Sequence, residues 1–177
     1  MRLQGSFPYN RPALLSDGGR RGRPRKEVVA PGAFRFRIEE PAEEIYLLAG
    51  HRYDKPLASK RAGTLTFTET AAALLISAVV TPLIAETQHG RDAISLLTAG
   101  LATGLSPGFR MPPERVVPPE QAEEITEEPD NPEEGENRAL IRTIKDALLY
   151  EFSVVTQPAY PDAQVEARRW TPPAGSL

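Results

Sequence analysis

Short runs of apolar residues, some continuous and some alternating with polar ones, predict that most of this chain forms β-strands. The continuous run at residues 45–49 (IYLLA) is typical of a buried strand. Residues 64–68 (TLTFT) alternate polar and apolar side chains, which is typical of a strand with one buried face. The branched residues at 74–80 (LLISAVV) indicate another strand, and shorter runs predict closing strands at residues 152–155 and 164–167.

Two segments show the apolar spacing of an amphipathic helix instead. In residues 91–102, the apolar side chains of Ile94, Leu97 and Leu101 recur at intervals of three and four. Residues 138–149 (RALIRTIKDALL) carry a comparable apolar face and predict a second helix. Because strands outnumber helices, the pattern predicts a mainly β or α+β fold, and no internal repeat is visible.

Charge is concentrated in two segments of opposite sign. Residues 1–26 carry seven basic side chains and one acidic one, with three Pro and four Gly, so we expect a mobile basic N-terminal segment. Residues 112–137 carry ten acidic side chains and one basic one, and their repulsion predicts a solvated acidic loop. We expect one folded domain at residues 27–170, with this loop inserted in it, and a disordered tail at residues 171–177.

Composition then excludes several classes of protein. The chain has 177 residues and a formal net charge of −3, which argues against a surface built wholly for nucleic acid. It contains no Cys, so disulfide scaffolds, cysteine nucleophiles and thiolate zinc sites are excluded. No apolar run approaches the ~18–20 residues that span a bilayer, and the first ten residues lack the apolar stretch of a signal peptide. We expect a cytosolic chain with no membrane partner.

Histidine is scarce, and its two positions differ in local context. Imidazole titrates near neutral pH, so histidine is the commonest general base in enzymes. His51 directly follows the end of the predicted strand, Leu48-Ala49-Gly50, which would hold its ring rigidly with an open tip. A partly exposed structural histidine fits the same position. His89 lies among polar residues before the predicted helix and is the weaker candidate.

Ser106 is the candidate nucleophile in residues 104–109 (GLSPGF), where glycines would allow a ligand to approach the backbone closely. The spacing G-x-S-x-G is that of a nucleophile elbow, but an elbow runs from strand to helix. Here a predicted helix comes first and Pro107 follows the serine, so an α/β-hydrolase fold is disfavoured. A plain Gly/Pro turn explains the segment equally well.

Glu151 interrupts an apolar segment at residues 149–155 (LYEFSVV). In a strand, Glu151 and Ser153 would share one face, and Phe152 and Val154 the other. A carboxylate that faces a partly dry interior requires a partner, such as a histidine on a neighbouring strand. An exposed glutamate on an edge strand is an equally good interpretation.

Four segments match, in the same order along the chain, the motifs of one known family. They are RKEVVAPGAF at residues 25–34, LLAGH at 47–51 with Asp54, Pro56 and Leu57, AGLATGLSPGF at 99–109, and ALLYEFSVVTQPAYPDA at 147–163. Together they resemble the motifs of the prohead maturation serine proteases of tailed bacteriophages, a family related in fold to the herpesvirus capsid protease assemblin. The resemblance extends over roughly residues 25–169.

The histidine motif departs from the family pattern at three positions. Gly50 replaces the usual Asn before the histidine, Arg52 occupies the common Asp position, and Ala58 stands where Gly is usual. Asp54 could take over the role of the missing acid, or that acid is not essential. The departures leave His51 and Ser106 unchanged.

The resemblance implies an assemblin-like β-barrel flanked by a few helices. It implies that His51 is the general base, Ser106 the nucleophile and Glu151 the third catalytic residue, with Asp54 as the alternative. Backbone amides near Ser106, or Arg110, would stabilise the oxyanion. No cofactor and no metal is expected.

The resemblance also implies a biological role. The chain would be a serine endopeptidase that forms an acyl-enzyme and acts inside the assembling procapsid, in the cytoplasm of the bacterial host. Its substrates would be the scaffold or the delta region of the major capsid protein, and also the protease itself. A homo-oligomer is possible.

Two other classes of function remain open. Residues 21–26 (RGRPRK) resemble an AT-hook, in which a basic arm lies in the minor groove of DNA, although we expect no nucleic-acid partner. Alternatively, the chain is a non-catalytic capsid scaffold or assembly protein that keeps the protease fold.

Overall fold

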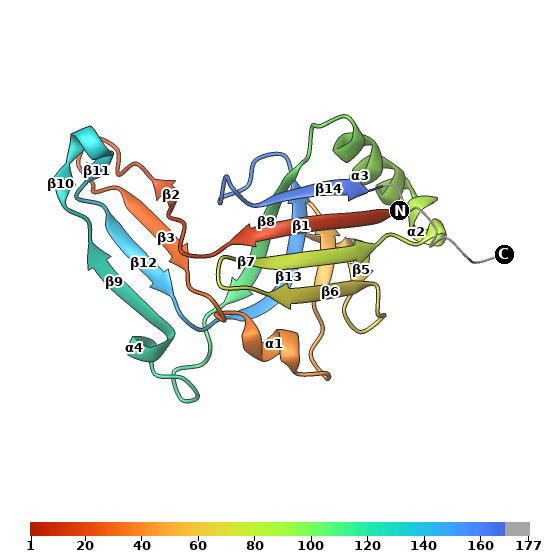
Figure 1. Cartoon of the computed structure of the whole chain (residues 1–177), viewed down its shortest axis with the longest axis horizontal. Helices are drawn as coiled ribbons and strands as arrows, with labels where there is room; N and C mark the ends of the chain where they lie inside the picture. The colour runs from red at the N-terminus through yellow and green to blue at the C-terminus, as the bar shows by residue number, and fades with distance from the viewer. Residues whose placement is uncertain (169–177) are drawn as a thin grey trace.

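One strongly curved sheet dominates the computed structural model, which describes residues 1–168 (Figure 1). Its edge strands β5 and β6 are consecutive in the chain and joined by a short turn, so the sheet nearly closes into a barrel. In sheet order the strands are β5 (Arg52–Ser59), β4 (Tyr46–Ala49), β13 (Leu148–Val155), β8 (Gly104–Arg110), β14 (Gln164–Arg168), β1 (Arg2–Pro8), β7 (Ala73–Val79) and β6 (Leu65–Glu69).

The interior of the barrel is filled by aromatic side chains from distant parts of the sequence. Phe7, Phe34 and Phe152 are completely buried. The ring centroid of Phe7 lies 5.9 Å from that of Phe34 and 5.7 Å from that of Phe152. Truncating such a ring to alanine costs about 3–5 kcal/mol. Phe152 of β13 packs in this core, and its neighbour Glu151 lies on the opposite face of the same strand.

A second, four-stranded sheet lies beside the barrel, on the left in Figure 1. Buried Glu27 on β3 accepts hydrogen bonds from Arg142 of the same sheet and from the hydroxyl of Tyr160, which lies in the loop between β13 and β14. The sheet has the order β2 (Ala13–Ser16), β3 (Arg25–Val29), β12 (Leu140–Ile144) and β9 (Glu123–Glu127), and near it lie α4 (Pro119–Ala122), β10 (Asp130–Asn131), the 3₁₀ helix η1 (Pro132–Glu134) and β11 (Glu136–Asn137).

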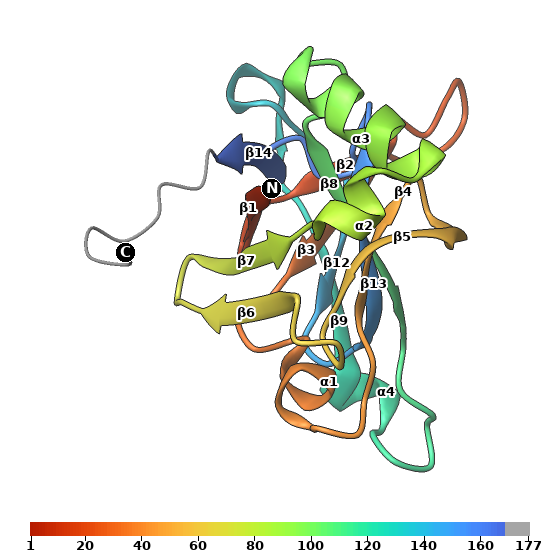
Figure 2. The same ribbon diagram turned by 90° about the vertical axis from the view of Figure 1, so that its right-hand side faces the viewer.

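Helices α2 (Pro82–Ala85) and α3 (Gln88–Thr98) lie together against one end of the barrel (Figure 2), and α1 (Arg35–Glu39) lies at the other. The Thr87 side chain caps α3 by accepting a hydrogen bond from the backbone N–H of Gly90. Ala93 and Leu97 are buried. The chain leaves the helix through Gly100, which has a φ of +72°.

The mainly β, barrel-like fold expected from the sequence is confirmed. The strands predicted at residues 45–49, 64–68 and 74–80 correspond to β4, β6 and β7. The two predicted closing strands correspond to the second half of β13 and to β14. The helix predicted at residues 91–102 is α3, which begins and ends earlier in the chain.

The prediction that residues 1–26 are mobile is wrong. Strand β1 lies inside the main sheet, where it pairs antiparallel with both β14 and β7. The prediction averaged composition over the whole segment and overlooked Leu3 and Phe7, which are buried on one face of β1. Farther along, Lys26 forms an ion pair with buried Glu128, and Arg23 forms one with Glu127 at 2.7 Å.

The prediction of a solvated loop at residues 112–137 is wrong in part: most of the segment is exposed, as expected, but it contains β9, and four of its ten acidic residues form ion pairs with cations of other segments. Strand β9 pairs antiparallel with β12. Glu123 forms an ion pair with Arg142, and Glu124 lies 2.6 Å from Lys145. Around β9, ion pairs between segments therefore offset the predicted repulsion, and a local count of charges cannot detect them.

The helix predicted at residues 138–149 is absent, and strands β12 and β13 occupy this segment. β12 pairs in parallel with β3 and antiparallel with β9, so both of its edges have hydrogen-bonding partners. Its Ile141, Thr143 and Ile144 are β-branched, a type enriched in strands. Tertiary pairing therefore overrides the helical spacing of the apolar residues.

The predicted disordered tail at residues 171–177, like the last residues of the predicted domain at 27–170, lies outside the described residues. Within residues 1–168, no helix is both long enough and apolar enough to cross a membrane.

Candidate active site

His51 lies in the two-residue turn that joins β4 to β5, where Ala49 pairs with Arg52. Gly50 has a φ of +63° and His51 a φ of +60°, as the tight turns of hairpins require. This conformation costs an ordinary residue roughly 1–2 kcal/mol, whereas Gly and Asn adopt it readily. The requirement explains why Gly50 can replace the asparagine of the family pattern.

Two hydrogen bonds to β13 hold this turn in place. The backbone N–H of Gly50 donates to the carbonyl oxygen of Val154 at 3.1 Å. The backbone N–H of His51 donates to the side-chain oxygen of Ser153 at 2.8 Å. The strained turn is thereby fixed on the strand that also carries Glu151.

The His51 imidazole contacts the carboxylate of Glu151, with 2.7 Å between Nδ1 and Oε1. The side chain of Glu151 is 5% exposed and that of His51 is 45% exposed. Because Nδ1 faces a carboxylate, this nitrogen is assigned the proton, and Nε2 is left free to accept one. The sequence left open whether Glu151 is paired or exposed on an edge strand, and the structure shows the paired arrangement.

Ser153 holds both members of this pair, a role that the sequence interpretation missed. Its hydroxyl donates to Glu151 Oε2 at 2.6 Å and accepts the backbone N–H of His51. The residue is completely buried. The sequence signal was present, since Ser153 was expected on the face of Glu151, but a serine hydroxyl carries no evident role until its partners are known.

Gly108 on β8 provides the space in which the Glu151 carboxylate lies. The two residues face each other across the β8–β13 pairing. A Cβ atom at position 108 would come within 2.0 Å of Glu151 Oε1. The sequence interpretation also missed this function, which requires knowledge of the strand register.

Ser106 lies within strand β8, so the alternative of a plain Gly/Pro turn is wrong. It faces Ser153 across the β8–β13 pairing, which places both side chains on one face of the sheet. Its exposed fraction is 9%. Within residues 1–168 the Ser106 hydroxyl forms no hydrogen bond to the His51 imidazole, and β13 is the structural link between them. Catalytic hydrogen bonds are often long before substrate binds.

Within residues 1–168, none of the other candidates forms a hydrogen bond or ion pair with His51 or Glu151. Asp54 is exposed and receives two hydrogen bonds from Arg52, at 3.1 and 2.7 Å, which hold the pKa of its carboxyl below the usual value. His89 Nε2 lies 2.9 Å from the carbonyl oxygen of Pro56. Arg110 is exposed at the end of β8.

Burial raises the pKa of Tyr53, and the negative charge of nearby Glu151 adds to this effect.

The AT-hook-like segment at residues 21–26 faces acidic partners, since Arg23 and Lys26 are in the ion pairs described above.

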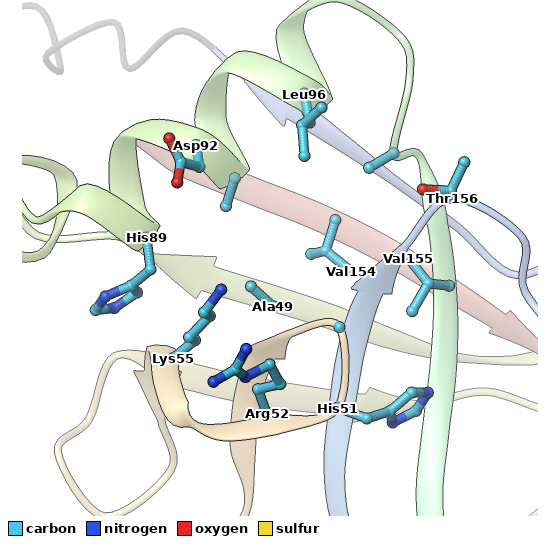
Figure 3. A pocket seen from close by; sticks show the side chains of 13 residues that line it. Ala49, His51, Arg52, Lys55, His89, Asp92, Leu96, Val154, Val155 and Thr156 are labelled. Carbon is cyan, nitrogen blue, oxygen red and sulfur yellow. The ribbon is translucent and has the colours of Figure 1, made fainter.

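A cavity of about 410 Å³ opens beside the His51 turn, between β5, the end of β13 and helix α3 (Figure 3). His51, Lys55 and His89 line it together with apolar residues. Figure 3 shows the side chains of Arg52 and Lys55 rising from β5 into this space. Ser106 is not among the lining residues, so the cavity adjoins the site on the histidine side.

The site combines a histidine that contacts the buried carboxylate of Glu151 with a serine on the neighbouring strand, on the same face of the sheet as that carboxylate. These are the residue types of a serine hydrolase site. The model of the caudovirus prohead serine protease family matches residues 19–172, and the chain belongs to this family. It is therefore a serine protease of capsid maturation. No curated protein and no solved structure matches the chain.

Proposed function

We propose that His51, Ser106 and Glu151 form the catalytic set of an endopeptidase that works through an acyl-enzyme. One observation carries this proposal: the 2.7 Å contact between His51 Nδ1 and the buried Glu151 carboxylate. Ser106 lies on the strand next to Glu151 and on the same face. Family membership supplies the reaction class.

In the first half of the reaction, Ser106 Oγ attacks the carbonyl carbon of the scissile peptide bond, and His51 Nε2 takes the hydroxyl proton. The resulting imidazolium is stabilised by the Glu151 carboxylate on Nδ1. When the tetrahedral intermediate collapses, the C–N bond breaks and the leaving amine takes the proton from Nε2.

In the second half, a water molecule attacks the acyl-enzyme while Nε2 accepts one of its protons. Collapse of the second tetrahedral intermediate breaks the bond to Ser106 Oγ, which recovers its proton. Backbone amides near Ser106, or Arg110, are the proposed donors to the oxyanion. Glu151 stays ionised throughout and orients the ring, with Ser153 as a positioning residue for both.

The proposed substrates are capsid proteins inside the assembling procapsid: the scaffold or the delta region of the major capsid protein. We further propose that the protease cleaves its own chain there. Family membership and the motif resemblance support these substrates.

The test is co-expression of the full chain with the major capsid protein and scaffold of the phage that encodes it. We expect Ser106→Ala and His51→Ala to abolish processing, while Ser95→Ala, at an exposed serine of α3, leaves it intact. A fluorophosphonate probe should label Ser106 in the unmodified protein. Processing that continues unchanged in Ser106→Ala would refute the enzyme proposal and favour the scaffold alternative.

A further inference from the structure

The cavity beside His51 is the part of the molecule that the catalytic set leaves unexplained. Its volume of about 410 Å³ lies in the range of small ligand sites, which is ~300–1,000 Å³. Gly50 and His51 form part of its wall. A substrate side chain in this cavity would therefore belong to a residue close to the scissile bond.

The cavity is apolar in its interior and basic on one side. Its apolar lining comes from α3 and its C-terminal flank and from β13, through Ala93, Leu96, Ala102 and Val154. Such a surface would bury the aliphatic stem of a bound side chain. It provides no partner for a buried charge, so any charged tip must be paired near the rim.

The cationic groups on that rim differ in how they are used. The Arg52 guanidinium is bound to Asp54, so its charge is already compensated. Lys55 also points into the cavity (Figure 3). Its charge contributes to the lowered pKa of Asp54, but its ammonium forms no hydrogen bond or ion pair with any residue from 1 to 168. Lys55 is therefore the cation that a ligand can engage.

Two other polar side chains of the lining, His89 and Asp92, have partners of their own. His89 Nε2 contacts the Pro56 carbonyl oxygen at 2.9 Å. The lone carboxylate among the lining residues, Asp92, accepts a hydrogen bond from Gln88 Nε2 at 2.7 Å. Among the lysine and arginine side chains of the lining, Lys55 is therefore the one without a hydrogen bond or ion pair to residues 1–168.

We propose that this cavity is a specificity pocket that binds a glutamate or aspartate side chain of the protein substrate, with the carboxylate paired to Lys55. The inference rests on the proposed function, since it assigns a substrate class to the same site. A charge-assisted hydrogen bond of this kind is expected to favour Glu over Gln at one substrate position by about tenfold or more.

The experiment is digestion of a proteome-derived peptide library by the full chain, with cleavage sites read by mass spectrometry. In the wild type, Asp and Glu should be enriched at one position within a few residues of the cleaved bond. Lys55→Met should remove this enrichment, and Lys55→Glu should replace it with a preference for Lys and Arg. The matched control is Lys145→Met, because Lys145 pairs with Glu124 on the distant four-stranded sheet and its loss should leave the profile unchanged.

The outcomes separate this inference from the proposed function. If Ser106→Ala abolishes cleavage, the protease proposal stands. The pocket is then overturned either by a wild-type profile without an acidic preference or by a Lys55→Met profile that does not change. A preference for Lys or Arg in the substrate that disappears in Asp92→Asn would show that Asp92 recognises the substrate, and would also overturn the pairing with Lys55. Cleavage that persists in Ser106→Ala contradicts the proposed function itself.

Discussion

The carboxylate of Glu151 lies directly over the backbone of Gly108, in space that any side chain at position 108 would occupy. The Oε1 atom that a Cβ would approach to 2.0 Å is the same oxygen that contacts His51 Nδ1. The neighbouring strand thus contributes to the proposed catalytic pair through the absence of a side chain.

Gly108→Ala should therefore displace the Glu151 carboxylate and misplace the imidazole. We expect kcat/KM to fall on the order of 10²-fold or more, because a shift of ~1 Å in a catalytic group can cost that much. Peptide cleavage is the measurement, with circular dichroism to check the fold. Ser95→Ala is the control, since Ser95 is exposed on helix α3 and is not part of the site. Full activity in Gly108→Ala would contradict the role given to this contact.

Ser153→Ala removes the hydroxyl that binds Glu151 and the N–H of His51. We expect the free energy of unfolding to fall by ~1–3 kcal/mol, because buried polar groups lose their partner. We expect kcat/KM to fall about tenfold to hundredfold, as part of the general-base contribution is lost. Its pH profile should also shift, whereas a purely structural role would lower the amount of folded enzyme without moving the profile. Ser153→Thr, which keeps the hydroxyl, should recover part of the activity.

Glu151→Gln and Asp54→Asn together identify the third catalytic residue. Replacing the carboxylate of a catalytic triad by an amide lowers kcat by about 10⁴-fold, because the imidazole is held in the wrong tautomer. We expect a loss of this order for Glu151→Gln and little change for Asp54→Asn, since Asp54 is exposed and bound to Arg52. The reverse ranking in a kcat measurement would move the assignment to Asp54.

Stability should depend on pH through the contact between the basic and acidic segments. Hydrogen bonding from the Lys26 ammonium lowers the pKa of Glu128 below its ordinary value of 4.5. The Glu128 carboxyl therefore binds a proton less tightly in the folded state than in the unfolded state. The stabilisation is present above about pH 4.5 and is lost as the pH falls through the lowered pKa of the folded state.

Urea unfolding between pH 7 and about pH 3 checks this expectation. Glu128→Gln should reduce the acid-side loss of stability, whereas Glu133→Gln, at an exposed glutamate of η1, should not. Identical pH dependence in the wild type and Glu128→Gln would exclude the proposed contribution of this pair.

Deleting residues 1–9 should abolish cooperative unfolding. The deletion removes β1 from between β14 and β7, together with buried Leu3 and Phe7. Losing two such side chains costs ~2–5 kcal/mol each, against a total stability of about 5–15 kcal/mol. Thermal unfolding followed by circular dichroism is the measurement. A truncated chain that still unfolds cooperatively would restore the interpretation of this segment as a mobile arm.

Local patterns were reliable where one segment decides its own structure. Alternation at residues 64–68 and the buried run at 45–49 predicted β6 and β4, and the position after a strand predicted a rigidly held His51. They failed at residues 138–149, where the apolar spacing fits a helix but β3 and β9 provide partners for both edges of a strand. They failed again for the charged segments, whose counterions lie far away in the sequence.

By itself, the sequence determined the dominance of strands. It also supplied a scarce histidine as a candidate general base and, among apolar residues, a glutamate that could orient it. Only the tertiary structure decided that Glu151 contacts His51, that Ser153 holds both, and that Gly108 must lack a side chain. The physical reason is register: which residues face each other across β4, β13 and β8 depends on how strands distant in the chain pair, and a single-residue slip would turn Glu151 to the opposite face.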